Sequence, residues 1–251
     1  MTITDSTEPT RAQATAPTIQ GDVRPDLRPI GVNHLAIATT DMKAQLTYWS
    51  DVLGCPTKAL YWMHGVAGTF HGFVELSPES YVAFVQHPKN STDIQMGVSH
   101  AGSAGGPVTG GAMQHLALHV DTLDELLAMR DRIRSNGIQV MGPIDHGFCQ
   151  SIYFAGLEGL SLEVCCGRAI DERQWIDPEV TELCGISPAE LATLKEPRDR
   201  GPSDGPVAQP PFDPTQPQMD FGPGVNEFLM ARSDDDTWAQ ASETTPPVQL
   251  L

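Results

Sequence analysis

The chain has 251 residues, enough for one large domain or for two small modules. Its formal charge at pH 7 is −17, with only 15 lysines and arginines, so it would be repelled by phosphate backbones and by anionic membrane surfaces. We therefore expect no nucleic-acid partner and no membrane partner. The five cysteines are an odd number without paired spacing, which indicates reduced thiols in a cytoplasmic protein.

Residues 1–29 are polar and have no apolar core, which predicts a disordered arm and neither a signal peptide nor a membrane span. Ordered structure is expected from Ile30. The stretch Ile30–Ala38 predicts a strand, because Leu35 and Ile37 share one face while His34 lies on the other.

A helix is expected over Asp41–Leu53, because apolar residues recur at helical spacing and Gly54 is a natural stop. Three strands should follow this helix, at Thr57–Trp62, Thr69–Leu76 and Tyr81–Gln86. Residues 89–110 are rich in Gly and Ser, which predicts a linker or a mobile loop.

A second strand is predicted at Gly111–Val120 and carries His115. Thr122 and Glu125 form a capping box for a helix that runs to Asn136 and ends at Gly137. Three strands are again expected, at Gln139–Met141, Ser151–Ala155 and Leu160–Cys165.

The two halves therefore repeat one pattern. His34 and His115 each open a strand–helix–glycine unit that continues into three strands, which indicates a duplicated βαβββ module. The modules span residues 30–88 and 111–168 within a domain of residues 30–168. Strand parity places His34, His115 and Glu163 on the faces opposite the large apolar residues.

Beyond this domain, residues 169–196 contain two capping residues that are each followed by proline. They predict short docking helices at 178–184 and 188–195. Residues 197–251 are dominated by Pro, Gly, Asp and Gln, which predicts an extended or disordered tail.

The stretch Asp145–Glu163 resembles the signature of extradiol ring-cleavage dioxygenases, in the vicinal oxygen chelate superfamily with the glyoxalase and bleomycin-resistance folds. The matching positions are His146, Ile152–Tyr153, Gly159 and Glu163. Gly156–Leu157 replaces the acidic–Pro pair of the signature, which is a departure at the turn and not at the chemistry. The resemblance implies an α+β fold whose two tandem modules form an open, cup-like mixed sheet with helices outside.

The resemblance also implies a metal site inside the cup. Two imidazoles and one carboxylate are the ligands of a non-haem Fe(II) facial triad, and the matching residues are His34, His115 and Glu163. Mn(II) could occupy the same ligands. Superfamily members that isomerise usually add a fourth ligand near the position of Ala83, which cannot bind a metal.

Three further residues are candidates for catalysis. By resemblance, His146 would lie near the O₂ position as a hydrogen-bond donor or acid–base group, and Tyr153 would hydrogen-bond the bound substrate oxygen. Extradiol enzymes carry another acid–base His at a position that falls near Ser80 here. His71, on the preceding strand, could enter the cup instead, either for proton transfer or as pocket lining.

The sequence thus predicts an Fe(II)-dependent extradiol-type dioxygenase that cleaves a catechol or related aromatic diol with O₂. Two alternatives stay open: a metal-dependent lyase or isomerase of the same superfamily, and a non-catalytic small-molecule binder like the bleomycin-resistance proteins. A homodimer is compatible with the resemblance. The expected rim of the substrate pocket consists of Trp62, Met63, Phe73, Tyr81 and Phe148.

Overall fold

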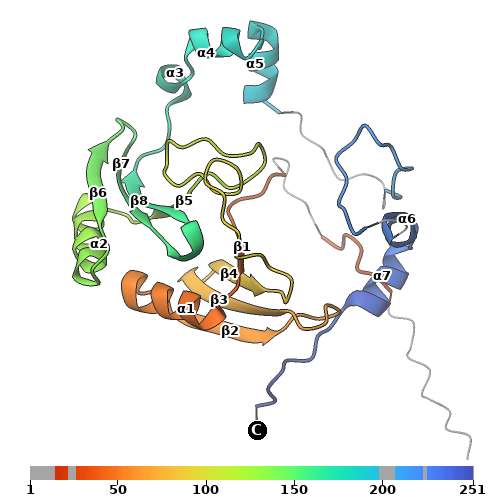
Figure 1. Ribbon diagram of the computed structural model, residues 1–251. Helices are drawn as coiled ribbons and strands as arrows, with labels where there is room; N and C mark the ends of the chain where they lie inside the picture. Colours follow the sequence, from red (N-terminus) through yellow and green to blue (C-terminus); the bar gives the residue numbers. More distant parts are fainter. Residues whose placement is uncertain (1–14, 22–26, 198–206, 223–224, 251) are drawn as a thin grey trace, which may run out of the picture. The chain divides into compact units, whose positions relative to one another are not determined.

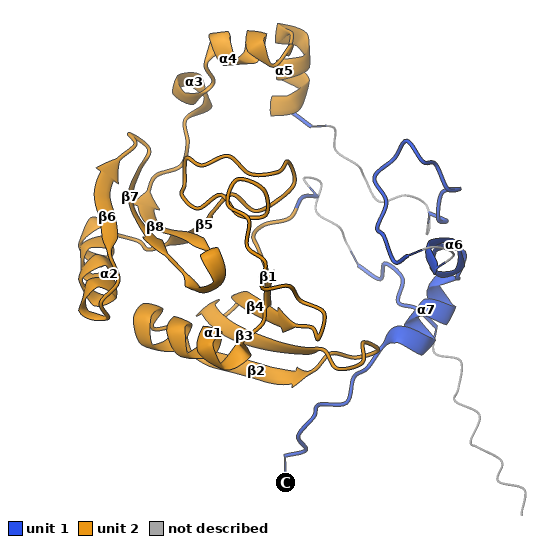
Figure 2. Cartoon of the chain, in the orientation of Figure 1, with its two compact units in different colours: residues 1–28, 196–251 blue, residues 29–195 orange. Residues whose placement is uncertain are grey.

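The computed structural model describes residues 15–21, 27–197, 207–222 and 225–250. The chain divides into two compact units, one of residues 29–195 and one of residues 1–28 with 196–251 (Figure 2). None of the helices within the described ranges is long and apolar enough to cross a membrane. All five cysteines lie in these ranges and are free thiols.

The first module is a strand, a helix and three strands, as predicted (Figure 1). Its elements are β1 (His34–Thr39), α1 (Met42–Tyr48), the π-helical turn η1 (Trp49–Leu53), β2 (Thr57–Trp62), β3 (Phe70–Ser77) and β4 (Ser80–Gln86). β1 begins later than Ile30 because β4, its parallel partner, begins only at Ser80. Gly54 ends the helix with a φ of 80°, a left-handed conformation that glycine adopts at no steric cost.

The second module repeats this order. Its elements are β5 (Leu116–His119), α2 (Leu123–Ser135), β6 (Val140–Asp145), β7 (Cys149–Ala155), the 3₁₀ turn η2 (Leu157–Gly159) and β8 (Ser161–Gly167). The predicted capping box of Thr122 and Glu125 is confirmed, and Gly137 follows the helix with a φ of 78°. β5 is shorter than predicted, so His115 lies one residue before the strand.

The two modules form two separate four-stranded mixed sheets, with strand orders β1-β4-β3-β2 and β5-β8-β7-β6. In each, the first and last strands of the module pair in parallel and the other pairs are antiparallel. The α+β fold with tandem βαβββ modules is therefore confirmed. Residues 89–110, predicted as a linker, contain a bridge between Met96 and His100.

One hydrophobic core spans both modules. It includes the fully buried side chains Trp49, Phe84, Leu126, Ile133, Ile152 and Leu162. α1 packs on β3 and β4, and α2 packs on β6, β7 and β8. Each sheet therefore buries one face under its helix, and the predicted site residues lie on the opposite faces.

After β8 the chain forms α3 (Glu172–Trp175), α4 (Pro178–Leu183) and α5 (Pro188–Lys195). The helices predicted at 178–184 and 188–195 are confirmed, whereas α3 was not predicted.

The other unit contains α6 (Val225–Met230) and α7 (Asp234–Ala241). The prediction of extended or disordered chain over 197–251 is wrong for these two helices. Most of the predicted N-terminal arm, residues 1–14 and 22–26, lies outside the described residues, as do 198–206, 223–224 and 251.

Candidate metal centre

The register of the sheets aligns the two modules residue by residue. Ala36 of β1 pairs with Ala83 of β4, and Ala117 of β5 pairs with Glu163 of β8. Glu163 therefore has Ala83 as its counterpart in the first module, as the sequence indicates. The methyl side chain of Ala83 cannot bind a metal, so only the second module offers a ligand at this position.

His115 and Glu163 lie together on the face of the second sheet that α2 leaves uncovered. His115 Nε2 is 3.0 Å from Glu163 Oε2, and the Glu163 side chain is 7% exposed. Two cis ligands on an octahedral ion with metal–ligand bonds of about 2.1 Å are separated by about 3.0 Å. This nitrogen–oxygen pair is therefore spaced as two neighbouring ligands of one metal ion.

Amide side chains fix the tautomer of both predicted histidine ligands. His34 Nδ1 is 2.8 Å from Asn33 Oδ1. In the second module, His115 Nδ1 is hydrogen-bonded to Gln114 Oε1. An amide oxygen can only accept, so each Nδ1 is the donor in this contact. Histidines that bind metals are commonly oriented in this way, by a second hydrogen bond from the ring nitrogen that does not bind the metal.

This tautomer gives the contact between His115 and Glu163 a chemical meaning. An Nε2 lone pair and a carboxylate oxygen repel each other unless a cation lies between them. That cation is either a proton, which makes His115 an imidazolium, or a metal ion. The donor set of the second module is therefore built to share a cation.

His34 is not brought into this group. No three His, Cys, Asp or Glu side chains within the described ranges lie close enough together to hold a metal. His34 instead belongs to an aromatic cluster on the uncovered face of the first sheet, where its ring centroid is 5.6 Å from that of Phe73. The other members of the cluster are Tyr61, His71 and Tyr81. Two of the three predicted donors thus lie together in this structure, and the third lies apart.

His146 and Tyr153 are brought together beside Glu163. His146 Nε2 and Tyr153 Oη are hydrogen-bonded at 2.9 Å. Tyr153 is the cross-strand partner of Glu163. Burial, together with the charge of Glu163, raises the pKa of Tyr153, so the phenol keeps its proton at neutral pH. An imidazole and a phenol therefore adjoin the His115–Glu163 pair on one sheet.

His71 lies on the first module and faces the aromatic cluster. Burial and the proximity of His34 lower the pKa of His71, so this imidazole is neutral at pH 7. Its Nε2 is buried without a hydrogen-bond partner among the described residues. Ser80, at the position of the expected acid–base histidine, donates instead to the carbonyl of Val32 at 2.9 Å.

The residues predicted to form the rim of the pocket lie in different parts of the structure. Phe73 and Tyr81 are in the aromatic cluster, whereas Trp62 lies on the other side of its strand against Phe70. Phe148 packs against Trp175 of α3.

Sequence reasoning missed Asn33 and Gln114, and Tyr61 in the aromatic cluster. The amides directly precede the two histidines of the repeat, and this adjacency was the only signal that could have found them.

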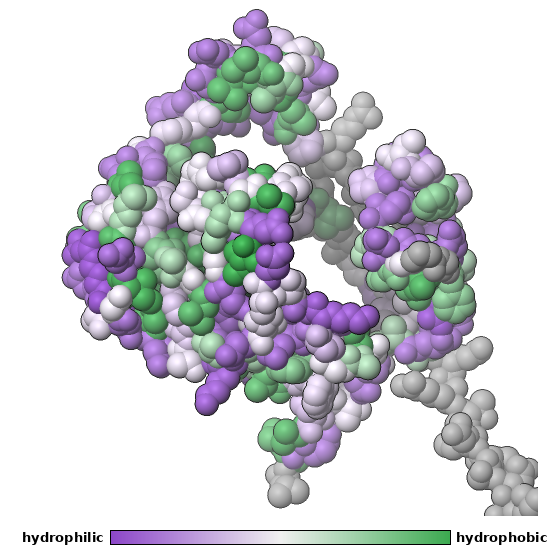
Figure 3. All heavy atoms as spheres, viewed as in Figure 1, coloured by the Kyte–Doolittle hydropathy of each residue, from purple (hydrophilic) through white to green (hydrophobic). Residues whose placement is uncertain are grey.

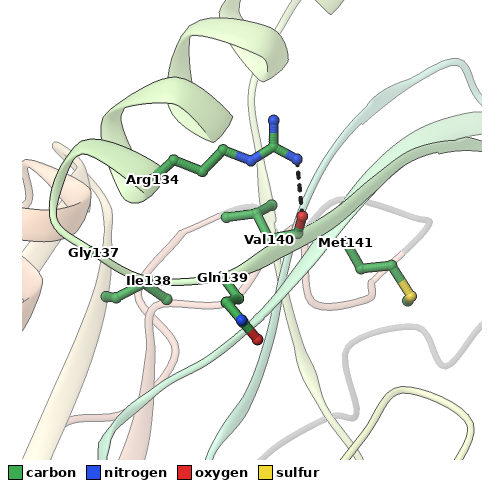
Figure 4. Close-up of a pocket in the computed structure, with 6 residues that line it drawn as sticks. All are labelled: Arg134, Gly137, Ile138, Gln139, Val140 and Met141. Carbon is green, nitrogen blue, oxygen red and sulfur yellow. Dashed lines mark hydrogen bonds between the residues drawn. The ribbon is translucent and has the colours of Figure 1, made fainter.

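A shallow hollow of about 600 Å³ lies at the C-terminal end of α2 and is lined by Arg134, Gly137, Ile138, Gln139, Val140 and Met141 (Figure 4). Arg134 Nη2 donates to the Val140 carbonyl at 3.0 Å across it. None of the predicted site residues lines this hollow, so it is separate from the candidate metal centre.

Comparison with known proteins gives one match to a family. The sequence profile of the Glyoxalase/Bleomycin resistance protein/Dioxygenase superfamily matches residues 31–164. No curated protein matches the chain.

Three similar solved structures show the range of the likeness. A glyoxylase/bleomycin resistance protein/dioxygenase domain from a Frankia species has 16% identity and a TM-score of 0.46, covering 56% of this chain and 100% of its own. The fosfomycin resistance protein FosX from Listeria monocytogenes, complexed with Mn(II) and sulfate, has 14% identity and a TM-score of 0.40, covering 59% and 99%. TnmS3, an antibiotic binding protein from a Streptomyces species, has 17% identity and a TM-score of 0.40, covering 57% and 99%. These likenesses are too weak to bear on function.

Proposed function

The chain belongs to the Glyoxalase/Bleomycin resistance protein/Dioxygenase superfamily, and within it we propose that this protein is an Fe(II)-dependent extradiol-type dioxygenase acting on a catechol or related aromatic diol. One observation carries the proposal. On the uncovered face of the second sheet, a nitrogen–oxygen pair spaced for a divalent metal adjoins a hydrogen-bonded His–Tyr pair.

The metal would be held by His115 and Glu163, with His34 as the third ligand. All three supply donor atoms that suit Fe(II), and Mn(II) could use the same set. When bound, such an ion supplies open coordination positions for a chelating diol and for O₂. The Nδ1 hydrogen bonds of both histidines support this assignment, because they leave Nε2 of each ring free to bind.

His146 and Tyr153 would handle protons beside the metal. In this proposal the mutual hydrogen bond of 2.9 Å holds both groups at one side of Glu163 before the diol binds. When the diol binds, the Tyr153 hydroxyl turns to donate a hydrogen bond to an oxygen of the diol, which leaves the lone pair of His146 Nε2 free. His146 Nε2 then accepts a proton from the diol and later returns one to the product.

His71 has a different place in the proposal. Because its ring is neutral and lies at steep angles against aromatic residues of the first module, we assign it to the wall of the substrate pocket. Tyr61 and Phe73, which are stacked with ring planes 12° apart, supply flat surfaces for an aromatic ring on the same face.

A second candidate is favoured by the separation of His34 from the other two donors. A protein that binds a small aromatic molecule without catalysis would need the aromatic cluster but no complete triad. The lyase or isomerase alternative would need the metal but no oxygen.

Oxygen uptake separates these candidates. The protein would be prepared without air, reconstituted with Fe(II) and mixed with a panel of catechols, with His115→Ala as the matched variant. We expect oxygen uptake with a yellow ring-fission product, and loss of both in the variant.

Stoichiometric metal without oxygen uptake for any diol would contradict the dioxygenase and favour a lyase or isomerase. Saturable binding of aromatic ligands that is unaffected by removal of metal would favour the binding protein.

A further inference from the structure

α3 lies beyond residues 31–164, which match the family, yet it reaches back to the turn that carries His146. The indole of Trp175, the last residue of α3, packs edge-to-face on Phe148. Their ring centroids are 4.8 Å apart and their planes meet at 79°. Such aromatic pairs contribute about 0.5–1.5 kcal/mol beyond their buried area.

The indole also fills the space beside Gly147. This residue has a φ of +86°, and a Cβ at this position would lie 2.9 Å from Trp175 Cζ2. Only glycine combines that backbone conformation with so close a neighbour. Trp175 therefore contacts the two residues that directly follow His146.

Backbone hydrogen bonds tie down the same turn between β6 and β7. The His146 N–H donates to the Cys149 carbonyl at 2.8 Å, and the Arg168 N–H donates to the Phe148 carbonyl at 3.0 Å. The Gly147 N–H donates to Asp145 Oδ1 at 2.7 Å. Hydrogen bonds thus fix the main chain of this turn. The indole of Trp175 packs on the turn in addition to these bonds.

α3 is itself held in place. Asp171 caps it by accepting from the Arg173 N–H at 3.1 Å, and Glu172 pairs with Lys195 of α5 at 2.8 Å. α4 and α5 contain no buried residue, and Val180 and Leu183 of α4 are exposed. Figure 3 shows apolar surface on this helical segment. Trp175 is a contact through which this C-terminal segment reaches the candidate site.

We propose that Trp175 is a positioning residue for His146. By packing on Phe148 and Gly147 it fixes the turn so that His146 Nε2 meets Tyr153 Oη. The catalytic consequence rests on the proposed function, whereas the positional claim does not. His146 is exposed, so without the indole its ring would sample rotamers that do not reach Tyr153.

The test is a chemical-shift cycle on the metal-free protein. The ¹H–¹³C resonance of the His146 ring, assigned with His146→Gln, is recorded with and without Tyr153→Phe, in wild type and in Trp175→Ala. In wild type, Tyr153→Phe should shift this resonance because it removes the hydrogen bond. In Trp175→Ala the shift should fall at least twofold, and Trp175→Phe should restore most of it.

The control is Leu183→Ala, which changes an exposed apolar residue of α4 and should leave the shift unchanged. Trp175 is 45% exposed, so Trp175→Ala should stay folded, which its unfolding temperature checks. An equal effect of Tyr153→Phe in wild type and in Trp175→Ala would overturn the proposal.

Activity gives a second readout. With a catechol that the wild type cleaves, Trp175→Ala should lower kcat about tenfold at unchanged KM, since acid–base groups contribute about 10²–10⁴-fold. A higher KM at unchanged kcat would overturn the positioning role in favour of substrate contact. If the wild type cleaves no catechol, the proposed function fails while the chemical-shift cycle still decides the position of His146.

Discussion

At the scale of single residues, the candidate site depends on which ring nitrogen of each histidine carries the proton. Asn33 and Gln114 settle this with one hydrogen bond each. Gln114 also donates through Nε2 to the carbonyls of Ser103 and Gly106, so its amide is held from both ends. The same contact, between Nδ1 and an amide oxygen of the preceding residue, therefore occurs in both modules.

Variants of Gln114 test the role of its side-chain oxygen as the acceptor of the hydrogen bond from His115 Nδ1. Gln114→Leu removes the oxygen that holds His115 Nδ1–H, so the other tautomer should become populated and metal affinity should fall about 10–100-fold. Gln114→Glu keeps an acceptor and should keep the tautomer. Ring-nitrogen ¹⁵N shifts report the tautomer, and metal titration reports the affinity. Equal tautomer populations in Gln114→Leu and wild type would contradict the assignment.

Residue patterns predict only part of this site. Parity predicted the faces of His34 and Glu163, because the strands that carry them do alternate. His115 lies one residue before its strand, so the alternation of β5 does not include it. Parity could not predict the amide contacts, since neighbours on a strand point to opposite faces. Asn33 and Gln114 reach their histidines because both precede the regular strands. Nor could parity show that His34 lies among aromatic residues, which depends on the strand order and register of the first sheet.

At the scale of elements, polar contacts join the modules within the described residues, and two groups of them involve a charged side chain. Glu158 in η2 accepts hydrogen bonds from Thr39 Oγ1 at 2.6 Å and Gln45 Nε2 at 2.8 Å, and from the Thr40 N–H at 2.7 Å and Oγ1 at 2.6 Å. Arg132 of α2 donates to the last carbonyls of the first helix, including Val52 O at 2.9 Å. Since η2 leads directly into β8, the first contact ties the strand that bears Glu163 to the first module.

Glu158→Gln should weaken this contact. The variant loses the charge and keeps one acceptor oxygen, so unfolding free energy should fall by about 1–2 kcal/mol, a figure reduced for partial exposure. Chemical denaturation at pH 7 measures it, with the exposed Glu179→Gln of α4 as control. A loss no larger than that of the control would show that the contact contributes nothing.

The same carboxylate predicts a pH dependence. Partial burial opposes the charged form, but the hydrogen bonds from Thr39, Thr40 and Gln45 outweigh it and lower the pKa of Glu158. A lowered folded pKa gives stability that is present above the unfolded pKa, about 4.3, and is lost as pH falls through the folded value. Wild type should therefore lose its advantage over Glu158→Gln below about pH 4. A constant difference from pH 7 to pH 3 would contradict this.

The helices that the sequence did not predict are short. α3 has four residues, too few for a periodic pattern, and depends on the Asp171 cap. α7 lies in the part of the chain predicted to be extended or disordered. Ser233 caps it, and Asp234–Asp236 fill its first turn, where negative charge favours a helix. By contrast, α2 combined a capping box with 13 residues and was predicted almost to its ends.

At the scale of the whole domain, one core joins two modules that divide the predicted ligands between them. His34 belongs to the first module, and His115 and Glu163 belong to the second. A metal ion that used all three would bind only the native arrangement of the modules, so it would stabilise the folded domain by mass action. Whether His34 joins the other two is therefore a question that stability can answer.

Mn(II), which does not react with O₂ as readily as Fe(II), suits this measurement. At a concentration of 100 Kd it should stabilise wild type by about 2.7 kcal/mol and raise the unfolding temperature accordingly. His115→Ala should abolish the effect, because it destroys the nitrogen–oxygen pair. His34→Ala should weaken binding about 10–100-fold, which at the same metal concentration removes about 1.3–2.3 kcal/mol. His87→Ala, which changes a histidine just after β4, should behave as wild type. If His34→Ala bound Mn(II) as tightly as wild type, the second module would hold the ion without it. His34 would then belong to the aromatic cluster alone.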